Sequence, residues 1–132
     1  MYYLGDAYYF LENYPVAIGY YDRAIEGEIQ DKNIYYRRGK SHIQRENYEF
    51  AIVDFTNALK FDANDAQIYI DRAMAYTYQN NFEEAIKDLE KALTFDTENP
   101  KLYYNRGYLK EETEDYEGAV QDYTKVIELD PK

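Results

Sequence analysis

One serine and one histidine are the only obvious partners for a hydrolytic site in this chain of 132 residues. They are Ser41 and His42, which are adjacent in sequence. Neighbours on a helix point about 100° apart, so these two side chains cannot form a nucleophile–base pair. The chain has no cysteine, which excludes a thiolate nucleophile, a disulfide and a Cys-based zinc site. These residue types predict a protein that is not an enzyme.

Carboxylates are abundant, but their spacing does not indicate a metal site. No stretch has the spacing of a calcium-binding loop with its glycine and final glutamate. Asp62, Asp65 and Asp96 fall at expected helix starts or turns, where capping and solvated roles are usual. The six glycines are dispersed, so no glycine-rich phosphate loop is present. We therefore expect no metal ion and no cofactor.

The charge of the chain argues against two classes of partner. Fifteen basic residues against 26 acidic ones give a net charge of −11 and a pI near 4.5, which repels nucleic acid and anionic lipid. No apolar run approaches the roughly 18 residues of a membrane span, and Met1 is followed at once by Tyr2 and Tyr3 without a basic leader. A soluble protein is expected, and the cytoplasm is the simplest choice for a compartment that the sequence does not fix.

A period of 34 residues runs through the whole chain without a gap. Three small positions repeat at this step: Gly5, Gly39, Ala73 and Gly107; Ala17, Ala51, Ala85 and Ala119; and Ala24, Ala58, Ala92 and Val126. Large, mostly aromatic residues hold another position, at Tyr21, Phe55, Leu89 and Tyr123. Two helices approach closely only where side chains are small, and rings fill the gaps beside them. Since His42 takes the place of Tyr8 and Tyr76 in this period, we expect a packed histidine.

Helical periodicity with start and stop signals predicts four helix pairs. Their ranges are about 1–11 with 15–27, 32–45 with 49–61, 66–79 with 83–95, and 100–113 with 117–129. The second helices begin after Asn13, Asn47, Asn81 and Asp115, whose side-chain oxygens are expected to cap unpaired N–H groups. Pro15 and Pro100 then lie in first helical turns, where proline is tolerated.

The period, its small and aromatic positions, and Asp130-Pro131 closing the last unit resemble a tetratricopeptide repeat (TPR) array. The resemblance covers the whole chain as one domain, 1–132, with repeats at approximately 1–31, 32–65, 66–99 and 100–132. It implies an all-α, right-handed solenoid in which first helices line a concave groove and second helices form the back. It also implies protein–protein binding. The chain departs from the family where Ile29, Ala63 and Thr97 replace a closing proline.

Another departure is a charge at the usually apolar seventh position, which keeps its apolar type only as Leu4. Arg38, Arg72 and Arg106 hold this position in the other repeats, and these repeats also have Asp54, Asp88 and Asp122 at the twenty-third position. The repeat with Leu4 has Tyr20 there. A buried charge costs several kcal/mol unless it is paired, so we predict an Arg–Asp bridge within each helix pair. The alternative joins neighbouring repeats, Asp54 to Arg72 and Asp88 to Arg106.

Seven tyrosines fall on first-helix positions that line the groove in this family, and packing does not obviously require them. A contiguous exposed aromatic surface usually marks an interaction site, although each ring could simply be partly exposed. The predicted peptide-binding surface is Tyr2, Tyr3, Tyr9, Tyr36, Arg37, Lys40, Asp71, Met74, Tyr78, Lys101, Tyr104, Asn105 and Tyr108. Some family members hold a peptide C-terminus in a carboxylate clamp, but Asp71 stands in the best frame here and would repel that carboxylate.

Two function classes stay open. The first is a scaffold that binds a peptide segment of an unidentified protein partner. The second is a structural spacer or a self-assembling segment that makes its contacts through uncapped repeat ends, around Tyr123, Ile127 and Leu129. Because the first repeat starts at its fourth position and no polar capping helix follows Pro131, we expect an excerpt of a longer protein. It could also be the docking domain of that protein.

Overall fold

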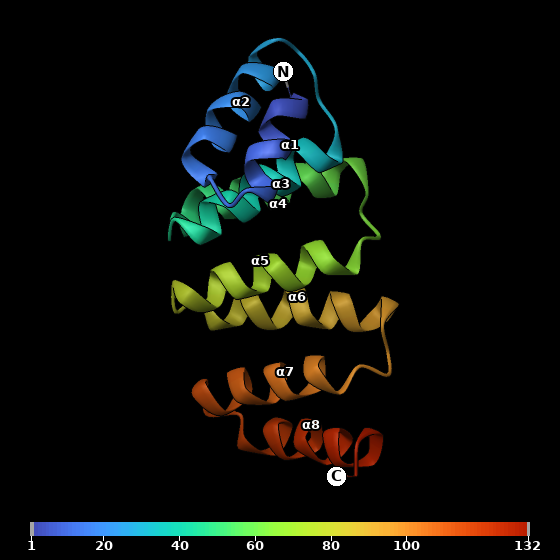
Figure 1. Ribbon diagram of the computed structural model, residues 1–132. Helices are drawn as coiled ribbons and strands as arrows, with labels where there is room; N and C mark the ends of the chain where they lie inside the picture. Colours follow the sequence, from blue (N-terminus) through green and yellow to red (C-terminus); the bar gives the residue numbers. More distant parts are fainter. Residues whose placement is uncertain (1, 132) are drawn as a thin grey trace. The chain divides into compact units, whose positions relative to one another are not determined.

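Eight α-helices and no strand make up residues 2–131, which the computed structural model describes. The helices are α1 (Tyr2–Phe10), α2 (Tyr14–Glu26), α3 (Lys32–Gln44), α4 (Tyr48–Phe61), α5 (Ala66–Tyr78), α6 (Phe82–Phe95), α7 (Pro100–Glu112) and α8 (Tyr116–Leu129). Consecutive helices pair antiparallel, as α1–α2 and α3–α4 show in Figure 1. The predicted helix ranges are confirmed to within one residue at every end.

The chain divides into two compact units, Met1–Asn64 with α1 to α4 and Asp65–Lys132 with α5 to α8. Each unit contains two helix pairs and is described by itself below. Among the helices of residues 2–131, none combines the length and the apolar character needed to cross a bilayer.

Close contacts between a small residue and a large one join the two helices of each pair. An added Cβ on Gly39 would lie 2.7 Å from Cε1 of Phe55, and one on Gly107 would lie 2.9 Å from Cε1 of Tyr123. Such distances are below van der Waals contact, so only glycine fits beneath these rings. The third pair has Ala73 and Leu89 at the same positions, and both side chains are buried. In this pair the first helix has an alanine methyl group in place of glycine, and the second helix has the smaller leucine in place of a ring.

The helix starts differ from the prediction at three of four second helices. Asn13, Asn47 and Asn81 make no side-chain capping hydrogen bond, whereas Asp115 accepts one from the Gly118 amide at 3.0 Å. A Cβ on Gly118 would lie only 2.8 Å from Cγ of Asp115. The capping side chain of Asp115 therefore occupies the space that a side chain at position 118 would need, and the other second helices have a side chain at this repeat position. The predicted asparagine caps were therefore wrong.

Capping oxygens stand instead before the first helices. Asp31 accepts from the Ile34 amide at 3.0 Å, Asp65 from the Gln67 amide at 3.1 Å, and Asn99 from the Lys101 amide at 3.1 Å. Pro15 and Pro100 lie in the first turns of α2 and α7, as predicted.

First helices end in a left-handed residue that recurs every 34 positions. Glu12, Glu46, Asn80 and Glu114 have φ between 60° and 65°. The following residue donates its amide back to the helix, as Asn47 does to the His42 carbonyl at 2.8 Å, which is the Schellman arrangement. Glycine is the usual residue here, so glutamate gave no signal of these turns in the sequence.

The predicted Arg–Asp bridges are present, and each joins the two helices of one pair. Arg38 contacts Asp54 at 2.7 Å, while Arg72–Asp88 and Arg106–Asp122 are each 2.6 Å. The aspartate side chains are 2–6% exposed and the arginines 18–19%. Burial raises the pKa of the Asp54 and Asp88 carboxyls against the opposing hydrogen bonds from Arg38 and Arg72. The bridge therefore offsets a burial cost, and losing one partner would leave a costly buried charge.

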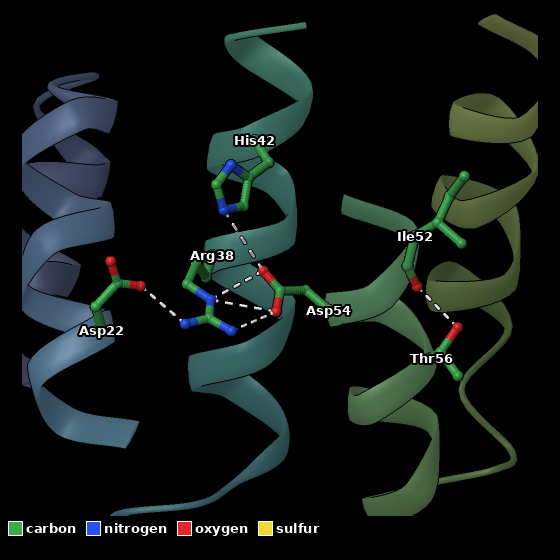
Figure 2. A network of polar contacts seen from close by, with 6 residues as sticks. All are labelled: Asp22, Arg38, His42, Ile52, Asp54 and Thr56. Atoms are coloured by element: carbon green, nitrogen blue, oxygen red, sulfur yellow. Dashed lines mark hydrogen bonds and ion pairs between the residues drawn. The ribbon is translucent and has the colours of Figure 1, made fainter. Parts of the chain in front are cut away.

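Figure 2 shows an addition to the first bridge that the sequence did not predict. Arg38 of α3 lies between two carboxylates, and its Nη1 contacts Asp22 of α2 at 2.8 Å. His42, one turn further along α3, directs Nε2 toward Asp54 at 3.9 Å and stacks on Phe50 with ring centroids 5.3 Å apart. The histidine is packed, as predicted, and its buried Nδ1 has no hydrogen-bond partner.

Replacing Gly39 with alanine should destabilise the chain. Overpacking against Phe55 costs about 1–3 kcal/mol, which exceeds the helix-propensity gain of about 1 kcal/mol. The matched control is Gly19→Ala in α2, because a Cβ there meets nothing within 4 Å. Urea denaturation should show lower stability for Gly39→Ala and higher stability for Gly19→Ala. Equal shifts in the two variants would contradict the packing rule.

His42 should make the stability of the chain depend on pH. Burial lowers the pKa of His42 from its ordinary 6.5. The folded state therefore binds this proton less tightly than the unfolded state, so stability is lost as pH falls below about 6.5, by at most about 1.4 kcal/mol per pH unit. Between about pH 7.5 and about pH 5.5 the urea midpoint should fall further in the natural chain than in the His42→Tyr variant, which has the same Asp and Glu residues. Identical differences would exclude this role.

Candidate functional site

The first unit contains a cluster of polar contacts around the carboxylate of Asp6. Arg37 of α3 reaches across to Asp6 of α1 with Nη1 at 2.6 Å from Oδ2, and the Tyr21 hydroxyl donates to Oδ1 at 2.7 Å. Burial raises the pKa of Tyr21, and the Asp6 hydrogen bond adds to this effect. Arg37 also lies over the Phe10 ring, 5.3 Å from its centroid. The predicted contact residue Arg37 thus has a structural partner within its own unit.

The other predicted contact residues of this unit divide into packed and exposed groups. Tyr2 and Tyr9 pack against the buried cluster around Ala17 and Tyr21. Tyr36 is half-buried with its ring centroid 5.9 Å from that of Phe55, and Lys40 is half-buried too. Tyr3 is exposed. Several rings predicted for the peptide surface therefore also stabilise helix packing.

The second unit contains a pocket of about 280 Å³ that is lined mainly by residues of its two first helices, α5 and α7. It is lined by Ile70, Ala73, Met74, Thr77, Tyr78, Leu89, Asn105, Tyr108 and Leu109. Four predicted surface residues are brought together here, namely Met74, Tyr78, Asn105 and Tyr108. We take this apolar pocket as the candidate functional site.

The pocket exists because the third repeat departs from the packing of its neighbours. In α3–α4, Tyr36 and Phe55 place their rings 5.9 Å apart, and in α7–α8, Tyr104 and Tyr123 place theirs 5.8 Å apart. The equivalent residues of α5–α6 are Ile70 and Leu89, which are aliphatic and smaller. Two rings are missing at this point, and both aliphatic side chains line the pocket.

The rim of the pocket carries exposed rings. Tyr78 is 57% exposed and Tyr108 is 45% exposed, and Met74 is also an exposed lining residue. Asn105 is exposed one turn before Tyr108 and presents a side-chain amide. An aromatic rim with one amide over an apolar floor suits the capture of an apolar side chain next to a polar backbone.

The remaining predicted residues of this unit lie around the pocket but do not line it. Tyr104 and Lys101 are exposed on α7. Asp71 is 3% exposed, and the Gln67 side-chain amide donates to it at 3.1 Å. Next to Tyr104, burial raises the pKa of Tyr123 to about 12, together with a 2.8 Å hydrogen bond to Glu111.

Sequence reasoning missed the floor of the pocket. Ile70, Ala73, Leu89 and Leu109 were taken as packing residues or not singled out. The available signal was the third repeat itself, which alone has alanine, isoleucine and leucine where the second and fourth repeats have glycine and two rings. A position that is smaller in one repeat than in its neighbours indicates a local hollow.

Ser41 and His42, the two residues considered for a hydrolytic site, make separate contacts. The buried Ser41 hydroxyl donates to the Arg37 carbonyl at 2.8 Å, one turn back along α3, and not to His42. Over residues 2–131, no group of three or more His, Asp or Glu side chains is placed to hold a metal ion. The arrangement is suited to binding.

Models of known families match along the chain. A tetratricopeptide repeat model matches residues 2–67, a TPR repeat model matches residues 73–113, and a further tetratricopeptide repeat model matches residues 100–132. No curated protein sequence gives a significant match.

Solved structures agree on the fold. "MamA 41-end from Desulfovibrio magneticus RS-1" is 25% identical with a TM-score of 0.88, covering 98% of this chain and 73% of that one. The Arabidopsis OM64 TPR domain is 28% identical with a TM-score of 0.70, covering 76% and 84%. YrrB, whose title describes "a TPR protein with an unusual peptide-binding site", is 20% identical with a TM-score of 0.88, covering 97% and 66%.

The repeat models reach from residue 2 to residue 132, and one of them spans half of the chain by itself. The matched ranges contain the antiparallel helix pairs α1–α2, α3–α4 and α7–α8, and the 34-residue period of small and large residues runs through the same sequence. TPR domains bind protein partners and are typically not catalytic. The chain belongs to the tetratricopeptide repeat family.

Proposed function

We propose that this chain is a protein-interaction scaffold that binds a peptide segment of a partner protein. The observation that carries the proposal is the apolar pocket between α5 and α7, with Tyr78 and Tyr108 exposed at its rim. Exposed aromatic side chains beside a concave apolar floor are typical of interaction sites.

The character of the rim favours a peptide. Tyrosine offers a large rigid surface at a low entropic cost and a hydroxyl group for a peptide amide. Met74 is flexible and can adapt to the shape of a bound side chain. Asn105 can pair with a peptide N–H or C=O group. Together these residues provide the contacts that an extended or helical segment needs.

First-helix residues of the other unit are candidates for further contacts. Tyr3 is exposed there, while Tyr36 and Lys40 are half-buried. Because Arg37 is bound to Asp6, it contributes a neutralised charge pair to this surface. These residues belong to the proposal as secondary contacts, with Lys101 and Tyr104 in the second unit.

Removing the two rim tyrosines should abolish peptide binding. The probe is a set of dodecapeptides enriched on the immobilised chain from a random phage-displayed library. Isothermal titration should give a loss of affinity of at least about thirtyfold for Tyr78→Ala with Tyr108→Ala, because central aromatic contacts contribute about 2 kcal/mol or more. The control is Tyr116→Ala, an exposed tyrosine of α8 outside the pocket. Failure to enrich any peptide, or equal binding by the double variant, would refute the proposal.

Self-association is a second candidate function, and the surface of α8 favours it. Ile127 is 65% exposed, whereas Leu93, which holds the same repeat position in α6, is 7% exposed. Val120 and Tyr116 are also exposed on α8. A second copy of the chain could cover this apolar surface in the way that neighbouring helices cover Leu93.

Sedimentation velocity tests this second candidate. The chain should associate with increasing concentration, and Val120→Glu with Ile127→Glu should abolish association because it places two charges on the apolar surface. Both positions are exposed, so the helical spectrum should not change. A natural chain that remains monomeric at high concentration would exclude self-association through α8.

A further inference from the structure

The volume of the α5–α7 pocket limits what can occupy it. Its volume of about 280 Å³ is at the lower end of the roughly 300–1,000 Å³ of ligand pockets and leaves room for a bulky side chain. The missing rings of the third repeat account for its position between Ile70 and Leu89. Two rings of the neighbouring repeats are absent here, so a side chain of a ligand can occupy the space that they would fill.

The floor of the pocket accepts an apolar group and penalises a polar one. The floor residues Ala73, Leu89 and Leu109 are each at most 3% exposed, and their side chains are purely hydrocarbon. The Thr77 hydroxyl already donates to the Ala73 carbonyl at 2.8 Å, so it presents no free donor. A polar side chain at this apolar floor would lose water and gain few hydrogen-bond partners, so an apolar side chain is favoured. The only amide in the lining is that of Asn105, which is exposed.

The charges near the pocket favour a basic residue beside this apolar side chain. Glu112 is exposed on α7, three residues after Leu109 and four after Tyr108, so it lies on the same side of the helix. Residues 65–132 contain 16 acidic and 8 basic residues, a net charge of −8. Lys110, the basic residue nearest to Glu112 in sequence, contacts Asp122 at 3.4 Å. A lysine or arginine of a ligand would meet both this negative field and the faces of the rim tyrosines.

We propose that the pocket binds one bulky apolar side chain of a partner peptide that has a lysine or arginine close to it in sequence. This inference rests on the proposed peptide-binding function and specifies its ligand. Leu89, a second-helix residue, determines the specificity together with Ile70 and Ala73, because these three residues leave the space that the anchor side chain fills. Phe55 and Tyr123 close the equivalent space in the second and fourth repeats.

The chain provides its own design for closing the pocket. The variant Ile70→Tyr, Ala73→Gly, Leu89→Phe gives the third repeat the same three residue types as Tyr36, Gly39 and Phe55. Since this combination packs within the α3–α4 pair, the variant should fold. The control is Tyr116→Ala, which changes an exposed residue of α8 outside the pocket and leaves Ile70, Ala73 and Leu89 unchanged.

The experiment uses the full chain and the dodecapeptides enriched from the random phage-displayed library. The enriched peptides should share one leucine, isoleucine, methionine or phenylalanine with a lysine or arginine within a few residues. Replacing the shared apolar residue by alanine should lower the affinity at least about tenfold, and the pocket-closing variant should bind at least about tenfold more weakly than the natural chain. The control Tyr116→Ala should bind within about threefold of the natural chain, because Tyr116 does not line the pocket.

The outcomes separate this inference from the proposed function. If the peptides require Tyr78 and Tyr108 but share no apolar residue, or bind the pocket-closing variant with full affinity, the anchor inference fails and the peptide-binding function stands. If no peptide is enriched, or if binding does not depend on the rim tyrosines, both fail. Circular dichroism and urea denaturation of the pocket-closing variant must match the natural chain, and if it unfolds, binding of the alanine-substituted peptides decides the inference alone.

Discussion

The close contact between a small residue of each first helix and a large residue of its second helix is the constraint on which the structure depends. Gly39 under Phe55 and Gly107 under Tyr123 leave no room for a methyl group. The ring then covers the glycine and reaches Tyr36 or Tyr104 on the inner face. Where the pair becomes Ala73 and Leu89, the helices still pack, but the inner face is left with the pocket. Three changed residues of the third repeat, Ile70, Ala73 and Leu89, thus leave an apolar space where the neighbouring repeats are filled.

Buried charge has a different role in this fold. The three Arg–Asp bridges lie inside the helix pairs, and Arg38 adds Asp22 as a second carboxylate. Replacing a buried ion pair with apolar residues is often neutral for stability, so these bridges are better understood as fixing which faces of the helices meet. The first repeat has Leu4 and Tyr20 at the bridge positions and so does without a bridge.

Much of the fold followed from the sequence because small residues, rings and paired charges recur every 34 positions. The helix ends and the Arg–Asp bridges were predicted from that recurrence. The left-handed turns at Glu12 and Glu46 were not, since glutamate does not signal positive φ. The candidate site was predicted in part, because Tyr78 and Tyr108 were identified as surface residues. The floor at Leu89 was not predicted, because the sequence does not distinguish a leucine that lines a pocket from a leucine that packs in the core. A pocket forms where packed side chains leave a space unfilled, and that space can be recognised only when all the surrounding side chains are placed in the structure.

The location of a bound apolar side chain is the most direct test of this account. The chain with ¹³C-labelled alanine and leucine methyl groups can be examined by NMR in complex with an enriched dodecapeptide. The account predicts nuclear Overhauser contacts between the peptide's apolar side chain and the methyl groups of Ala73 and Leu89, with weaker contacts to the Tyr78 and Tyr108 rings. Contacts confined to α8 around Val120 and Ile127, with none to Ala73 or Leu89, would contradict it.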